Sequence, residues 1–168
     1  GGICIAVQGA KRGNSNTNRN DDSLWKDFLS LHFVAMLQSV LPDCAVAIDL
    51  DRPVKFLDTE LRKLARYSRR YSENPPDSNK YVDMLAEVPL LSGEDTWIFL
   101  HVEIQGRGGK ENFPLRMHRY RCLLESRYNR TVAGLALIIQ PLPFEQEEGF
   151  YRWSGFGSEV QYSYPVLR

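Results

Sequence analysis

Residues 96–106, TWIFLHVEIQG, decide the fold, because they form a long strand-like run that carries polar residues at its far end. An apolar residue recurs at every second position, which is the period of a strand with one face against a core. The opposite face carries His101, Glu103 and Gln105, just before a glycine. These polar residues either face water or form a site.

A second strand precedes this stretch. Residues 81–91, YVDMLAEVPLL, alternate in the same way, and the intervening SGEDT has the composition of a turn. We therefore predict an antiparallel hairpin of strands 81–91 and 97–105. One face of each strand is wholly apolar, so the strands must pair with those two faces on the same side of the sheet.

The register of this hairpin places two carboxylates side by side. Matching the apolar faces requires a loop of odd length, most simply one centred on Gly93 with Leu91 opposite Asp95. Asp83 then lies directly across from Glu103. At ~5 Å and an effective dielectric of ~20, these two charges would repel by roughly 3 kcal/mol.

Two opposed carboxylates in a sheet need compensation. A divalent cation would remove the repulsion, and ligands that are all oxygen atoms favour Mg²⁺, Mn²⁺ or Ca²⁺ over zinc. The alternative is a solvated polar face on which one carboxylate is screened or protonated. His101 shares this face. It could act as a base or support the metal ligands, and the alternative is a histidine that only packs against its neighbours.

The remaining elements are predicted from periodicity and from helix and strand breakers. We expect helices over 23–41, 54–70 and 114–129, strands over 44–50 and 131–141, loops over 72–79 and 106–112, and a closing hairpin in the aromatic tail. The strand 131–141 is apolar on both faces, as in a covered, partly parallel sheet. The order predicts an α/β fold, a mixed β-sheet flanked by helices. We expect the first helix to bury most of an apolar side formed by Leu24, Phe28, Leu31, Met36 and Leu37.

Length, charge and cysteine content limit the function classes. The 168 residues suit a flexible N-terminal extension over 1–21 and a single domain over 22–168. With 21 basic and 21 acidic residues the net charge is zero, so any nucleic-acid contact must use a local patch. Three widely spaced cysteines without zinc-site spacing favour a reduced, cytoplasmic protein. No apolar run approaches the ~20 residues that cross a bilayer, so we expect no membrane contact.

Two sets of basic residues provide such local patches. On the helix after Pro114, four arginines fall within roughly 80° of the helical wheel, namely Arg116, Arg119, Arg127 and Arg130. This row could grip phosphates, and the alternative is a solvated basic stripe. The second set lies in RKLARYSRR over 62–70 and includes Arg66.

Several segments taken together resemble a known family. They are DSLWKDFLSLHFVAMLQSVLPD, FLDTELRKLAR, YVDMLAEV, HVEIQG, RMHRYRCLLESRYNRTVAGLALI and YRWSGFGSEVQYSYPV. In this order they are similar to the recombination-promoting nuclease (Rpn) and transposase-related group of the PD-(D/E)XK nuclease superfamily. The resemblance extends from about Asp22 to the C-terminus and implies a restriction-endonuclease-like fold.

The resemblance also implies a function, the metal-dependent hydrolysis of DNA phosphodiesters by an endonuclease that uses Mg²⁺, Mn²⁺ or Ca²⁺. Asp83 matches the strand aspartate that binds the metal, and Glu103 matches the acidic member of the triplet. Glu60 matches a helix acid that supports the metal site. Gln105 stands where the superfamily usually has lysine.

This glutamine leaves two function classes open. Lysine can stabilise developing negative charge, whereas the amide of Gln105 is a neutral donor and acceptor, so catalysis by Asp83, Glu103 and Gln105 would depend on the metal. The alternative is a nuclease-like module that is catalytically weak or inactive and binds DNA or a protein partner. A nuclease that cuts both strands would need two such sites, which a homodimer provides.

Overall fold

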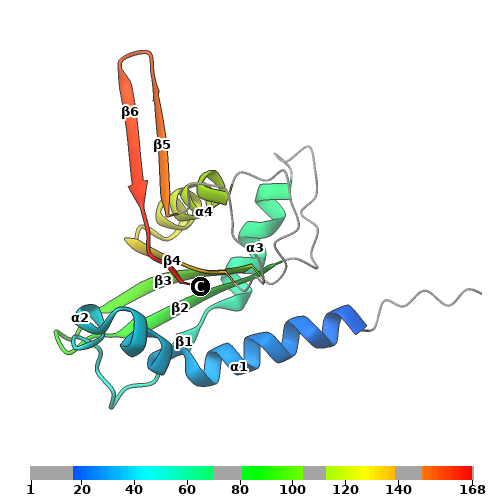
Figure 1. Ribbon diagram of the computed structural model, residues 1–168, viewed down its shortest axis with the longest axis vertical. Helices are drawn as coiled ribbons and strands as arrows, with labels where there is room; N and C mark the ends of the chain where they lie inside the picture. Colours follow the sequence, from blue (N-terminus) through cyan, green and yellow to red (C-terminus); the bar gives the residue numbers. More distant parts are fainter. Residues whose placement is uncertain (1–16, 70–80, 104–112, 139–148, 168) are drawn as a thin grey trace, which may run out of the picture.

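The fold is a mixed α/β arrangement, as the order of elements predicts. The computed structural model describes residues 17–69, 81–103, 113–138 and 149–167. A five-stranded sheet has the order β1-β2-β3-β4-β7, and a separate two-stranded sheet consists of β5 and β6 (Figure 1). The helices are α1 (Thr17–Val40), α2 (Pro42–Ala45), α3 (Asp58–Arg69) and α4 (Phe113–Tyr128). The strands are β1 (Lys55–Phe56), β2 (Tyr81–Pro89), β3 (Asp95–Glu103), β4 (Val132–Ile138), β5 (Phe150–Gly155), β6 (Ser158–Ser163) and β7 (Val166–Leu167).

Strands β2 and β3 form the predicted antiparallel hairpin, but in a different register. Asp83 lies opposite His101, and Tyr81 lies opposite Glu103. The predicted pairing of Asp83 with Glu103 is therefore wrong by two residues. A slip of two residues keeps each apolar face on its own side, so the alternation that fixes the faces does not detect it. In this register the backbone of residue 103 is a diagonal neighbour of Asp83, with their Cα atoms about 7–8 Å apart.

The turn between these strands sets the register. The Leu90 N–H donates to the Glu94 carbonyl at 2.8 Å, and the Gly93 N–H donates to the Leu90 carbonyl at 2.9 Å. Gly93 has a φ of +91°, a backbone conformation that glycine adopts without steric cost. Arg52 holds the turn from outside, because its Nη2 donates to the Leu90 carbonyl at 2.7 Å and its Nη1 to Asp95 Oδ1 at 3.2 Å. These contacts centre the turn on Ser92, one residue before the centre assumed in the prediction, and a shift of the centre by one residue changes the pairing by two.

Helix α4 connects β3 to β4, and these two strands are parallel, as predicted. Pro114 lies in the first turn of α4, where its fixed φ suits a helix start. Asn129 follows the last residue of α4 with a φ of +50°, the left-handed conformation that asparagine tolerates after a helix. Strand β4 then pairs with β7, again in parallel. Within the described residues, no helix is long and apolar enough to span a membrane.

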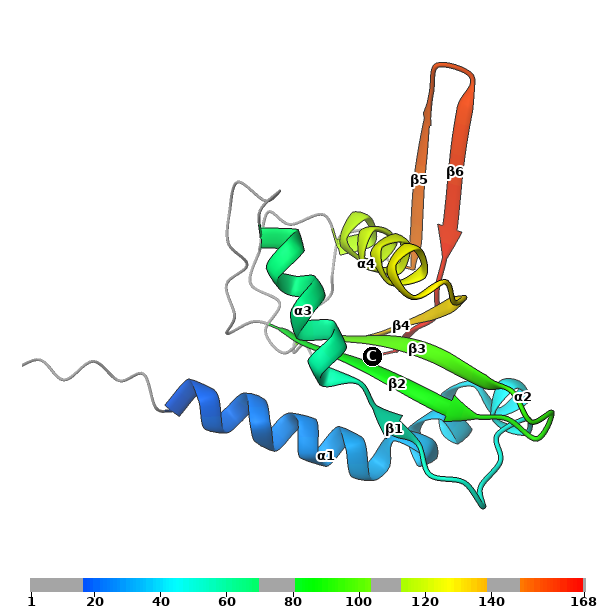
Figure 2. The same ribbon diagram turned by 180° about the vertical axis from the view of Figure 1, so that it is seen from behind.

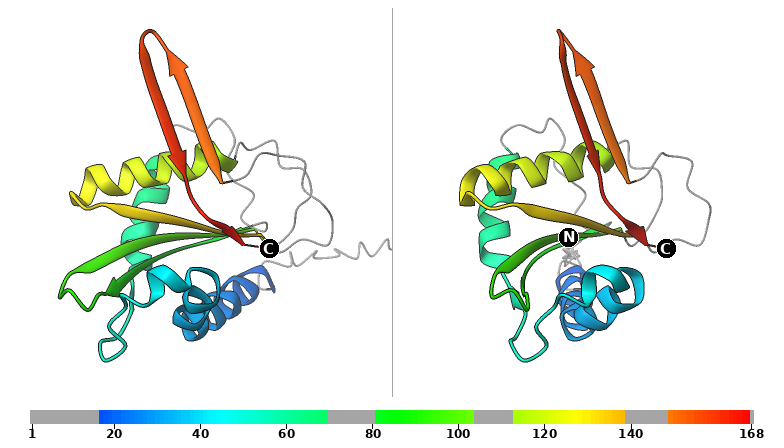
Figure 3. Two further views of the ribbon diagram at one scale, coloured as in Figure 1. Left: turned by 60° about the vertical axis from the view of Figure 1, so that its left-hand side comes forward. Right: turned by 90° about the vertical axis from the view of Figure 1, so that its left-hand side faces the viewer.

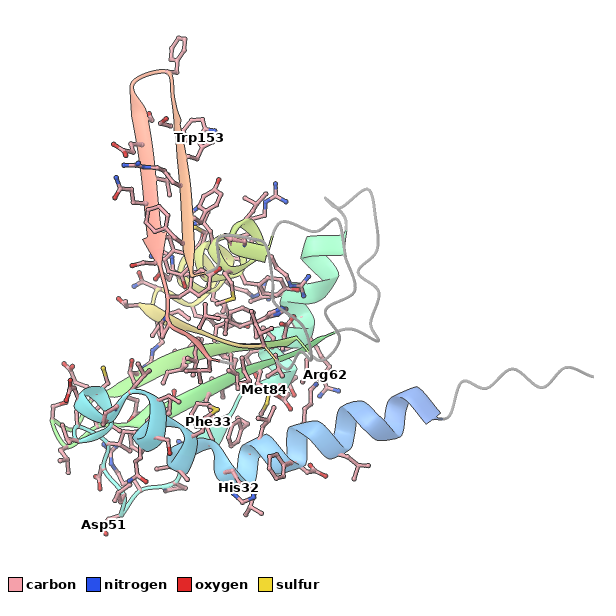
Figure 4. All side chains as sticks on the ribbon, in the orientation of Figure 1. His32, Phe33, Asp51, Arg62, Met84 and Trp153 are labelled. Carbon is pink, nitrogen blue, oxygen red and sulfur yellow. The ribbon has the colours of Figure 1, made fainter. Side chains whose placement is uncertain are left out.

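The five-stranded sheet separates two apolar cores, with α1 on one face and α3 and α4 on the other (Figure 3). On the α1 side, Phe33 packs in one cluster with Met84, and both side chains lie between helix and sheet (Figure 4). On the opposite side, Phe99 packs with Met117 of α4. Because strand residues alternate between faces, Asp83 lies on the α3–α4 side.

Helix α1 begins at Thr17, so the helix predicted over 23–41 starts six residues earlier than expected. The buried side of α1 consists of Leu29, Phe33 and Leu37. The prediction that α1 also buries its other large apolar residues is wrong, because Leu24, Phe28 and Leu31 are 65%, 55% and 80% exposed. These three residues and the exposed Ala35 are called the outer stripe below.

The predicted helix over 54–70 begins later than expected, because β1 precedes α3. The predicted strand over 44–50 is wrong, since Pro42 starts the short helix α2 and only Ile48 makes a strand bridge. The loops predicted over 72–79 and 106–112 lie outside the described residues.

The closing hairpin of β5 and β6 is confirmed, and it projects away from the body of the molecule (Figure 2). Its two-residue turn consists of Phe156 and Gly157, with φ values of +51° and +78°. At the base of the hairpin, Tyr162 is buried, and the ring of Tyr151 stacks on α4. Farther out, Trp153 is 48% exposed (Figure 4).

Candidate functional site

A nearly buried carboxylate lies between the sheet and α4. Asp83 Oδ1 accepts a hydrogen bond from His101 Nδ1 at 2.5 Å, and Asp83 Oδ2 accepts one from Arg116 Nη2 at 2.6 Å. The side chains of Asp83, His101 and Arg116 are 13%, 2% and 7% exposed. These three residues are called the Asp83 cluster below.

Three different elements position the Asp83 cluster. Asp83 in β2 and His101 in β3 are directly opposed in the hairpin, which brings their side chains together on one face. Arg116 comes from the first turns of α4, and its guanidinium also lies 4.9 Å from the ring centre of Tyr120. That ring stacks on Phe99 at 5.0 Å with an interplanar angle of 4°. The stack fixes the guanidinium beside the carboxylate.

The pKa of Asp83 reflects two opposing effects. Burial by itself raises the pKa, because a carboxylate loses its hydration in the interior. The charge of Arg116 and the contact with His101 outweigh this effect and lower the pKa from 3.8 to about 2. Asp83 is therefore ionised at neutral pH. An ionised carboxylate only accepts hydrogen bonds, so Nδ1 of His101 carries the shared proton.

The ionisation of Asp83 should make the free energy of unfolding depend on pH in the acidic range. Because its pKa is lowered in the folded state, its stabilisation is fully present above the ordinary value of 3.8 and is lost as the pH falls through about 2. This shift in the pKa of Asp83 corresponds to a contribution of about 2 kcal/mol to the free energy of unfolding. We expect the difference in unfolding free energy between the native chain and Asp83→Asn to shrink by that amount from about pH 5 to about pH 2. Urea unfolding at each pH measures it, and a difference that stays constant would contradict the expectation.

The four arginines predicted to form one row on α4 do not all face solvent. Arg116 is 8% exposed and belongs to the Asp83 cluster. Arg130 forms an ion pair with Glu87 at 3.2 Å. Arg119 and Arg127 are exposed, so these two are the members of the row that a phosphate group could reach.

The other predicted site residues are only partly described. Glu103 is the last residue of β3, and its side chain lies outside the described part of the structure, as does all of Gln105. Glu60 lies in the first turn of α3 and is half-buried. Among the described residues, no hydrogen bond or ion pair joins Glu60 to Asp83. The side chain of Arg66 also lies outside the described part.

Asp83 suits one oxygen ligand of a divalent cation. It is ionised, and after the bonds from His101 and Arg116 each carboxylate oxygen retains a lone pair. In the described part of the chain, no group of three or more His, Cys, Asp and Glu side chains is placed to hold a metal ion. The further ligands predicted for such an ion, Glu103 and the carbonyl of Ile104, lie outside the described side chains.

Sequence reasoning missed the ion pair between Asp83 and Arg116 and assigned the two residues to different roles. A signal for it exists, because an aspartate inside a strand with a buried face requires a partner. Arg116 lies between Leu115 and Met117 on the helix that covers that face, which makes it a suitable cation. Their separation of 33 residues in the chain hides the pairing from any local pattern.

The fold and the cluster define an α/β protein with a buried Asp–His–Arg arrangement on one face of its sheet. Comparison of the chain with protein-family models, with curated proteins and with solved structures gave no match.

Proposed function

We propose that the chain is a metal-dependent DNA endonuclease of the Rpn type, with a restriction-endonuclease-like fold and with Asp83 and Glu103 as ligands of Mg²⁺, Mn²⁺ or Ca²⁺. The observation that carries the proposal is a carboxylate kept ionised while nearly buried, in a strand whose register makes Asp83 a diagonal neighbour of the backbone of residue 103. Hard divalent cations bind ionised oxygen ligands. The resemblance of the HVEIQG segment and its neighbours to the Rpn group supports the same function.

In this proposal, different residues position the metal ligand and contact the DNA. A bound cation would lower the pKa of water and stabilise negative charge on a phosphate oxygen. His101 and Arg116 hold Asp83 in one orientation, because each occupies a different carboxylate oxygen. Arg119 and Arg127 are exposed on α4 and would contact the DNA backbone. Cleavage of both strands would require two copies of the chain.

A specific observation favours a second candidate, a nuclease-like module that binds DNA without cutting it. Arg116 already neutralises Asp83 at 2.6 Å, so this carboxylate is compensated without a metal ion. Gln105, in the position usually held by lysine, is consistent with lost catalysis. In this candidate the Asp83 cluster stabilises the fold only.

We expect the native chain to nick supercoiled plasmid DNA in the presence of Mg²⁺, and we expect Glu103→Gln to abolish nicking. Glu103→Gln removes the charge that binds the metal and keeps the shape of the side chain. The matched control is Glu94→Gln, at an exposed glutamate in the turn of the same hairpin, which should nick DNA as the native chain does. Gel electrophoresis of the plasmid measures both. Equal nicking by Glu103→Gln and the control would contradict the proposal.

Thermal unfolding separates the two candidates. If the chain is a metal-dependent nuclease, millimolar Mg²⁺ should raise its melting temperature, and Glu103→Gln should remove that rise. If Mg²⁺ changes nothing and the chain still retards DNA in a gel, the second candidate holds instead.

A further inference from the structure

We infer that the outer stripe of α1 is a contact surface between two copies of this chain, which pair through α1 as a parallel two-stranded seam. The inference rests on α1 alone and does not depend on the proposed function.

Helix α1 is apolar on two opposite sides. Its inner side, centred on Phe33, packs against the sheet, and the outer stripe faces away from the sheet. At 100° per residue, the centres of the two sides lie roughly 170° apart around the helix. In Figure 4, Phe33 points toward the sheet and His32 points away from it. A helix that is apolar on both sides is typically buried on both sides. The exposed outer stripe is therefore a surface on which a second helix can pack.

The spacing of the outer stripe is that of a coiled coil. Leu24, Phe28, Leu31 and Ala35 are separated by four, three and four residues, so they occupy d, a, d and a positions of two heptads. Both d positions are leucine, the residue typical of d in parallel two-stranded coiled coils. The phenyl ring of Phe28 lies 4.5 Å from the ring of His32, which extends the apolar surface along one flank.

The polar residues beside the outer stripe favour a parallel, in-register pair, because a carboxylate and an imidazole can form a hydrogen bond. With Phe28 at a, Asp27 is at g and His32 is at e of the next heptad, and both are exposed. In a parallel pair, g of one helix faces e of the partner five residues further on, so each Asp27 meets the His32 of the other copy. The pairing repeats on both sides of the seam by twofold symmetry. In an antiparallel pair, g faces g and e faces e, and this complementarity is lost.

A second copy suits this surface better than a nucleic acid does. A phosphate backbone requires basic residues beside the contact, whereas an aspartate borders the outer stripe. A second copy presents the same apolar stripe with the same complementary flanks. Helix α1 is also already anchored on the sheet through Leu29, Phe33 and Leu37, so pairing does not have to fold a short isolated helix.

Sedimentation of the full chain tests the inference. We expect the native chain to sediment with twice the monomer mass, and we expect Leu31→Glu to sediment as a monomer with an unchanged circular dichroism spectrum. Leu31 is 80% exposed, so its replacement should leave the fold of the monomer intact. The matched control is Leu91→Glu, at a leucine that is 68% exposed in the turn between β2 and β3. The control should remain a dimer. A native chain that sediments as a monomer would overturn the inference. The outer stripe would then be a binding surface for a different protein.

Cross-linking tests the orientation. In a chain whose cysteines are replaced by serine, Leu24→Cys should form a covalent dimer on treatment with a thiol oxidant, because d positions face each other in a parallel pair. Ser92→Cys, at an exposed position in the β2–β3 turn, serves as the control and should stay monomeric on a denaturing gel. A dimer that forms in solution but is not cross-linked through residue 24 would overturn the parallel arrangement.

Discussion

Replacement of Asp83 with alanine is expected to lower the free energy of unfolding by about 3–5 kcal/mol, because it leaves the charge of Arg116 buried without its carboxylate. The side chains of both residues are less than one-sixth exposed, so water cannot replace the lost contact. Urea unfolding at neutral pH measures the loss. A matched control is Asp95→Ala, which removes a carboxylate paired with Arg52 at 3.2 Å where both side chains are about one-third exposed. The control should cost about 1 kcal/mol or less.

A double variant shows whether the cost arises from the unpaired charge. Asp83→Asn with Arg116→Met removes both charges and retains most of the volume of the two side chains. We expect this double variant to be more stable than Asp83→Ala alone, because it leaves no buried charge unpaired. A loss in Asp83→Ala no larger than in the Asp95→Ala control would contradict a buried pair.

Gly134→Ala is expected to destabilise the fold by about 1–3 kcal/mol through overpacking. A Cβ atom at position 134 would overlap the hydroxyl oxygen of Tyr162 and lie 3.1 Å from Cε of Met117. Both neighbours belong to the core between the sheet and α4, so neither can move without disturbing packing. Thermal or urea unfolding of the single variant measures the effect.

Tyr162→Phe provides the matched test of this overlap, because it removes only the atom that a Cβ at position 134 would meet. The Tyr162 hydroxyl is buried and has no hydrogen-bond partner in the described residues, so the single change should be nearly neutral. Combined with Gly134→Ala, it should restore most of the lost stability. Purely additive effects of the two changes would contradict the contact.

Much of the fold can be predicted from the sequence, because the patterns that fix it are local. Alternation in residues 81–91 and 97–105 is sufficient to predict the hairpin and the face on which each side chain lies. The apolar run 131–141 is sufficient to predict a covered strand parallel to β3. The helix after Pro114 is confirmed over Phe113–Tyr128.

The errors have a common origin in tertiary contacts that periodicity does not encode. The register depends on a turn that Arg52 holds from a distant loop, 38 residues from Leu90 in the chain. The burial of Arg116 depends on Asp83, which belongs to another element. The outer stripe of α1 has the composition of a core, and only its position shows that the core of one chain does not cover it.

The pairing of β4 with β7 has a consequence for the order of folding. Among the described residues, β4 pairs with β7 through Ala136 and Leu137 alone, although β4 is apolar along its length. The β3–β4 and β4–β7 pairs are both parallel and join segments about thirty residues apart, which makes their formation slow. Until β7 docks, β4 presents an open apolar strand edge that other chains can add to. Refolding should therefore succeed in dilute solution and give way to aggregation as the protein concentration rises.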